Sequence, residues 1–122
     1  MIEQLQEALG PNYTVRKGYG DCDADVDVPD PMGGGVTVCF KQRRWCPGGA
    51  LHAGGGIKDA NGNYTWFGVH QTNPSRYKGR GWVAKIAEDI KEAVRVGTED
   101  IIVNNPGWLR GMTPDEARES IK

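Results

Sequence analysis

The chain has 122 residues, with 38% hydrophobic and 25% charged side chains, so its size and composition predict one globular domain over 1–122. A formal net charge of −1 argues against a general nucleic-acid binder, which is usually basic overall. No apolar run approaches the length of a membrane span, and the first ten residues lack the features of a signal peptide. Three cysteines without a disulfide-framework spacing favour a reducing setting, so we expect a cytoplasmic protein.

Two short elements are predicted at the start of the chain. Residues 2–9 carry one apolar stripe, which predicts a helix, and Gly10 followed by Pro11 predicts its end. Residues 13–19 predict the first strand.

An alternating acidic segment follows at residues 21–28. Its period of two places apolar side chains on the core face of a strand and carboxylates on the other face, at Asp21, Asp23, Asp25 and Asp27. Residues 36–45 predict the next strand, with Val36, Val38 and Phe40 inward. If the two strands pair as a hairpin, acids on one meet bases on the other, and each pair stabilises by about 0.2–1 kcal/mol. The four aspartates then do no more than neutralise the basic strand beside them, or they have a further role that the sequence leaves open.

A loop rich in proline and glycine separates this hairpin from a second one. An Asn-Gly pair is typical of a tight hairpin turn and predicts strands over 57–60 and 64–70. Among the tryptophans, charged or polar neighbours predict exposure for Trp45 and Trp66.

The longest predicted helix spans 82–96, where apolar residues recur at helical spacing, and Gly97 predicts its end. A β-branched run predicts a short strand over 100–104, and a capping box with proline at the first helical position predicts a terminal helix over 114–121. Together the elements predict an α+β fold. We expect an antiparallel sheet of four to five strands, one long helix packed on a face of it, and short helices at both termini.

Charge and aromatic residues are segregated along the chain. Residues 36–85 carry eight basic side chains against one acid, and seven of the ten aromatic residues, whereas the flanking segments are acidic. Cations bind phosphate and rings stack on bases, so this mixture predicts a non-enzymatic binding protein for a nucleotide or nucleic acid. The residues that we expect to contact this ligand are Arg43, Arg44, Trp66, His70, Arg76, Tyr77, Lys78, Arg80 and Trp82.

The loop before the long helix is the strongest candidate for the anion site. Three of its bases, Arg76, Lys78 and Arg80, lie around Tyr77 and just before Trp82. A helix N-terminus adds free N–H groups and a partial positive charge. No Gly-Lys-Ser/Thr sequence follows, so the loop does not match a phosphate-binding P-loop. The alternative is a solvated surface loop without a ligand.

Protein–protein interaction is the second function that the sequence supports. A small accessory or inhibitor protein of phage type would use exposed rings as anchors, because Trp, Tyr and Arg dominate such interfaces. We expect a homo-oligomer, since a chain of this size has little room for both a core and a deep pocket. We expect no cofactor, no metal and no membrane partner, and the lack of a nucleophile signature favours a non-enzymatic protein.

Two resemblances concern topology. The order helix, three strands, helix, strand resembles the restriction-endonuclease type of fold, which implies a metal-dependent nuclease with a metal at Asp27 or Asp30 and with Lys41 at the end of the third strand. The acid that this family carries two positions before the lysine is replaced here by Cys39, which removes a metal ligand.

An early helix, three strands and a later helix also resemble double-stranded-RNA-binding domains. This resemblance implies that Lys78, Arg80 and Lys85 lie at the start of the second helix.

Overall fold

The computed structural model describes residues 1–18, 20, 23–47, 57–58, 64–65 and 77–122. The helices are α1 (Ile2–Leu9), α2 (Trp82–Asn104), the 3₁₀ helix η2 (Pro106–Trp108) and α3 (Pro114–Ser120). The strands are β1 (Thr14–Lys17), β2 (Ala24–Asp27), β3 (Gly35–Cys39), β4 (Arg44–Pro47), β5 (Ile57–Lys58) and β6 (Tyr64–Thr65). The predicted α+β class, with a four-stranded antiparallel sheet, one long helix and short helices at both termini, is confirmed.

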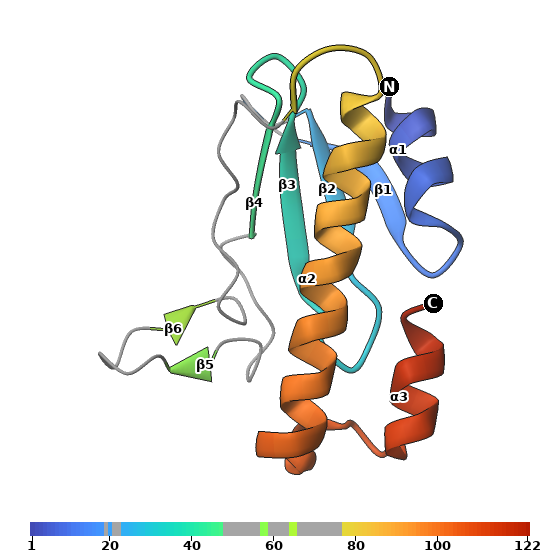
Figure 1. Cartoon of the computed structure of the whole chain (residues 1–122), viewed down its shortest axis with the longest axis vertical. Coiled ribbons are helices and arrows are strands. Elements are labelled where there is room, and N and C mark those ends of the chain that lie inside the picture. The colour runs from blue at the N-terminus through green and yellow to red at the C-terminus, as the bar shows by residue number, and fades with distance from the viewer. Residues whose placement is uncertain (19, 21–22, 48–56, 59–63, 66–76) are drawn as a thin grey trace.

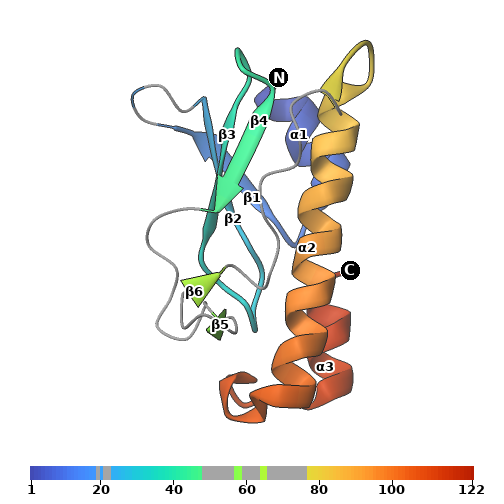
Figure 2. The same ribbon diagram turned by 60° about the vertical axis from the view of Figure 1, so that its left-hand side comes forward.

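The four longer strands form one antiparallel sheet in the order β1-β2-β3-β4. Both α1 and α2 lie against the same face of this sheet (Figures 1 and 2), while α3 packs on the C-terminal part of α2. None of the described helices is both long and apolar enough to cross a membrane.

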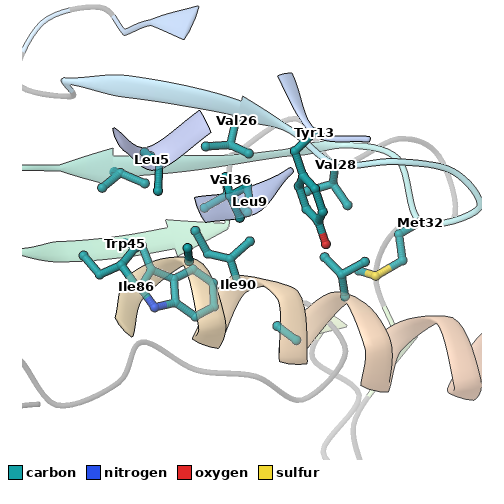
Figure 3. Packing of buried hydrophobic residues seen from close by; sticks show 14 of the residues in the cluster. Leu5, Leu9, Tyr13, Val26, Val28, Met32, Val36, Trp45, Ile86 and Ile90 are labelled. Carbon is teal, nitrogen blue, oxygen red and sulfur yellow. The ribbon is translucent and has the colours of Figure 1, made fainter. Parts of the chain in front are cut away.

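The core lies between this sheet face and the two helices. In β2 and β3 buried residues alternate with half-buried ones, as the period of two predicts, and Val26 and Val36 face inward. They pack with Leu5 and Leu9 of α1 and with the buried stripe of α2 that includes Ile90 (Figure 3). The core therefore fixes α2 across the sheet, which positions the start of this helix.

Gln6 connects α1 to β1 through backbone groups. Its side-chain amide donates to the carbonyls of Gly10 at 2.9 Å and Tyr13 at 2.7 Å, and its Oε1 accepts from the N–H of Val15 at 2.8 Å. These three bonds satisfy backbone polar groups at the end of α1 and the start of β1. The short connection between the two elements therefore leaves these three backbone groups paired.

The prediction of one strand over 36–45 is wrong. The segment turns at residues 40–43 and continues as β4, whose Trp45 lies opposite Val38 of β3. Arg43 closes the turn, with its N–H donating to the carbonyl of Phe40 at 3.2 Å and its own φ at +49°. No glycine or proline marks this turn, which is why the sequence pattern concealed it.

The predicted end of the long helix at Gly97 is also wrong, as is the strand over 100–104. Helix α2 continues to Asn104, because Ile101 extends the buried stripe of Val94 by two further turns. Tertiary packing outweighs the β preference of the β-branched run.

The predicted pairing of acids with bases between β2 and β3 is wrong for Asp25 and Asp27, while Asp21 lies outside the described residues. The register places Asp25 opposite Thr37 and Asp27 opposite Gly35. The ion pair forms on the other side of β2 instead, where Arg16 Nη2 lies 2.7 Å from Asp27 Oδ1. Lys41 and Arg43 lie beyond the end of β3, so they do not lie opposite Asp25 or Asp27.

The second hairpin and the terminal helix agree with the sequence. Strands β5 and β6 pair antiparallel as a separate two-stranded sheet, while Asn61, Gly62 and Trp66 lie outside the described residues. Thr113 and Glu116 form the predicted reciprocal capping box at the start of α3.

Candidate phosphate-binding site

An open groove of about 540 Å³ lies where α2 begins. Three parts of the chain line it: α1, the turn between β3 and β4, and the start of α2 with the loop before it. Its lining residues are Gln4, Ala8, Arg43, Gly79, Arg80, Gly81, Trp82, Val83 and Ala84. Figure 1 shows the β3–β4 turn and the loop into α2 at the same end of the molecule. We call this the α2-end groove.

Arg43 is held in the groove by two contacts that do not neutralise it. Its guanidinium carbon lies 5.0 Å from the centroid of the Trp82 ring, and its Nη1 donates to the carbonyl of Tyr77 at 3.1 Å. Its left-handed backbone conformation costs a non-glycine residue on the order of 1–2 kcal/mol. The Arg43 side chain is thus held in one position, and the backbone conformation of this residue costs free energy. Neither of the two contacts is with an acidic group, so the positive charge of Arg43 is not neutralised by them.

A buried hydrogen-bond chain fixes Tyr77 behind the groove. Trp45 Nε1 donates to the Tyr77 hydroxyl at 2.8 Å, and this hydroxyl donates to Asp89 Oδ2 at 2.6 Å. The chain connects β4, the loop before α2 and α2 itself. Because the Tyr77 carbonyl also holds Arg43, the position of that cation depends on this network.

The rings around the groove are packed inside. Tyr77 is 1% exposed and Trp82 is 7% exposed, and the edge of Phe40 meets the Trp82 ring at a centroid distance of 6.1 Å and an angle of 70°. The prediction that Trp45 is exposed is wrong, since it is buried beside Val38 on the core face of the sheet. None of these rings offers an open face to the groove.

The cations of the groove have no acidic partners in the described part of the chain. No ion pair among these residues involves Arg43, Lys78 or Arg80, although Lys78 and Arg80 are exposed. Two of the early aspartates have other partners: Asp27 pairs with Arg16, and Asp23 accepts from the backbone N–H of Phe40 at 2.6 Å, while Asp21 lies outside the described residues.

Two glycines shape the loop that carries Arg80. Gly79 and Gly81 adopt left-handed conformations, with φ of +78° and +75°, and a Cβ at either position would meet nothing within 4 Å. Glycine is therefore favoured there by backbone conformation and not by space. Gly81 is also the N-cap of α2 and supplies no side-chain cap, so the first-turn N–H groups keep their capacity to donate.

A second groove, of about 890 Å³, is lined by α2, by Ala8 of α1 and by the last two residues of the chain, and it shares Ala8 and Ala84 with the first. Its lining mixes basic residues with Glu88, Asp89 and Glu92. Mixed charge gives it no preference for an anion, which distinguishes it from the α2-end groove.

The structure brings together four of the predicted site residues, Arg43, Tyr77, Arg80 and Trp82. Tyr77 and Trp82 are buried, and they act by holding the Arg43 side chain. Lys78 is exposed in the same loop, and Arg44 is half-buried at the start of β4. Three further predicted residues, Arg76, Trp66 and His70, lie outside the described residues.

Sequence reasoning missed Gln4 and Ala8 of α1, which carry no chemical signal, and Asp89, whose partner Tyr77 lies before the helix. Asp89 follows Trp82 by seven residues, so helical spacing alone places both toward the same side of α2. This spacing is the signal that could have found it.

Each of the two carboxylates that the nuclease resemblance implies as a metal ligand lies beside an arginine. Asp27 is paired with Arg16, and Asp30 Oδ1 lies 3.8 Å from Arg110 Nε. Within the described ranges no three His, Cys, Asp or Glu residues group closely enough to hold a metal ion.

No known protein family matches the chain, and neither a curated protein nor a solved structure is significantly similar to it. The α2-end groove is therefore the one indication of function in the described part of the chain.

Proposed function

We propose that this chain is a non-enzymatic binding protein for a phosphate-bearing ligand, a nucleotide or nucleic acid, which it holds at the α2-end groove. The observation that carries the proposal is that Arg43 and Arg80, from separate loops, line one open groove without acidic partners among the described residues. Cations kept free of carboxylates at a concave surface favour a polyanion.

The fixed position of Arg43 supports the same function. A surface arginine usually retains many rotamers, which binding must restrict at a cost of about 0.5–1.5 kcal/mol. Arg43 is already restricted by the Trp82 ring and the Tyr77 carbonyl. Part of the entropy cost of binding has therefore been met in folding. Within the described part of the chain, only one of the three guanidinium nitrogens of Arg43 donates a hydrogen bond, which leaves the other two as donors for oxyanions.

The test is binding of a labelled oligonucleotide and of labelled ATP, measured by fluorescence anisotropy at low salt. Arg80→Glu reverses one charge of the groove, and we expect it to weaken binding of whichever ligand binds by about tenfold or more. Lys17→Glu makes the same change of charge on exposed β1 and is the matched control, with an expected effect within about twofold.

Equal affinities of Arg80→Glu and Lys17→Glu would show that only net charge matters and would contradict the site. Binding of neither ligand by the wild-type protein at low salt would contradict the proposed function as a whole.

A phage-type accessory or inhibitor protein that acts through a protein partner is the second candidate. Exposed apolar side chains at the far end of α2 favour it, since Val103 is 72% exposed and Trp108 is 36% exposed. This hypothesis expects Trp108→Ala to abolish a complex with the partner protein without lowering the melting temperature.

A homo-oligomer and a cytoplasmic location also stay predictions. Sedimentation velocity tests the oligomeric state.

A further inference from the structure

We infer that the α2-end groove takes the phosphodiester backbone of a nucleic acid and does not stack its bases. This inference rests on the proposed function and narrows its ligand class. The arrangement of the aromatic residues supports this inference. The charge pattern alone does not tell whether a bound nucleic acid stacks its bases in the groove.

Among the described residues that line the groove, Trp82 is the one aromatic residue, and its ring is not available to a base. Arg43 lies over the ring, Phe40 packs its edge against it, and 7% of the residue is exposed. A base that stacked there would have to displace Arg43, which would lose both the ring contact and the hydrogen bond to Tyr77. The groove therefore presents cations to the ligand, and the Trp82 ring holds Arg43 in position.

The described cations extend beyond the groove, which favours a chain of phosphates over a mononucleotide. The β3–β4 turn carries exposed Lys41 two positions before Arg43, and the loop before α2 carries exposed Lys78 two positions before Arg80. A mononucleotide places its phosphates in one cluster, whereas a polymer presents a row of single charges to both loops. Contacts of this kind position a backbone and carry no base sequence.

The experiment compares a labelled oligonucleotide with an abasic oligonucleotide of the same length, which keeps the phosphates and lacks the bases. If the backbone is the ligand, the wild-type protein binds the two within about twofold of each other. ATP is expected to bind at least about tenfold more weakly than either, because it engages fewer of the cations. Arg43→Gly should weaken binding of both oligonucleotides by the same factor.

Several results would overturn the inference while leaving phosphate binding intact. One is an abasic affinity more than about tenfold lower, which would show base stacking. The others are ATP binding as tightly as the oligonucleotide, or an Arg43→Gly effect confined to the oligonucleotide with bases. If no phosphate-bearing probe binds, the proposed function itself fails.

Discussion

Two buried tyrosines show how residues of one type have different roles in this core. The Tyr77 hydroxyl both accepts from Trp45 and donates to Asp89. The Tyr13 hydroxyl is buried and has no hydrogen-bond partner among the residues that the structure describes, and Figure 3 shows it pointing toward α2 beside Met32. Hydroxyl removal therefore has opposite expected effects at these two positions.

Tyr77→Phe keeps the ring and removes the hydroxyl that connects β4 to α2. We expect a loss of about 1–3 kcal/mol in the free energy of unfolding, because the buried Trp45 N–H loses an acceptor. Urea denaturation measures it. A change below about 0.5 kcal/mol would show that the hydrogen-bond chain contributes little.

Tyr13→Phe is the matched control, because it makes the same chemical change at a hydroxyl with no partner. Removing an unsatisfied buried polar group is expected to be neutral or stabilising by up to about 1 kcal/mol. A destabilisation as large as that of Tyr77→Phe would show that Tyr13 has a partner in solution.

Burial also raises the pKa of Tyr13 well above its ordinary value of 10.0. The folded state then holds this proton more tightly than the unfolded state does, so stability is complete below about pH 10 and falls as pH rises through the range above it. We expect urea midpoints above about pH 10 to fall more for the wild type than for Tyr13→Phe. Identical alkaline profiles would contradict the burial of this hydroxyl.

At the scale of elements, the burial pattern of the C-terminal turns of α2 distinguishes a helical conformation from an extended one. Ile101 is 1% exposed whereas Val103 is 72% exposed, which is a helical relation, since a strand would place both on one face. Ile101→Ala should lower the free energy of unfolding by about 2–4 kcal/mol, and Val103→Ala by less than about 0.5 kcal/mol. Comparable losses in denaturant unfolding would favour the strand.

The sequence was sufficient for elements whose own residues carry the pattern. The apolar stripe and Gly10 predicted α1, the alternation around Val26 predicted β2, and the capping box predicted α3. In each case the local preference and the tertiary environment agree, so a single chain reveals them.

The missed elements depend on contacts between distant residues. Arg43 adopts a glycine-like backbone conformation while Trp82 and Tyr77 hold its side chain, and both partners lie more than thirty positions further along the chain. Trp45 has polar neighbours in sequence, yet its strand turns it toward Val38. No local sequence pattern encodes the contacts of Arg43 or the inward orientation of Trp45. The charge of the site was therefore predictable from the sequence, but its geometry was not.

At the scale of the whole molecule, cations from two separate loops converge at one place. Asp27 of β2 pairs with Arg16 of β1, while Arg43 and Arg80 meet where α2 begins. A protein with a net charge of −1 can thus present a cationic surface at one end.

The salt dependence of duplex binding tests this convergence most directly. Each phosphate contact contributes about 0.9 to the slope of log K against log salt concentration. Arg43→Gly, which keeps the left-handed turn, and Arg80→Gln should therefore each make the slope shallower by about 0.9, and the double variant by about twice that. A wild-type slope near zero, or slopes unchanged in both variants, would contradict the account.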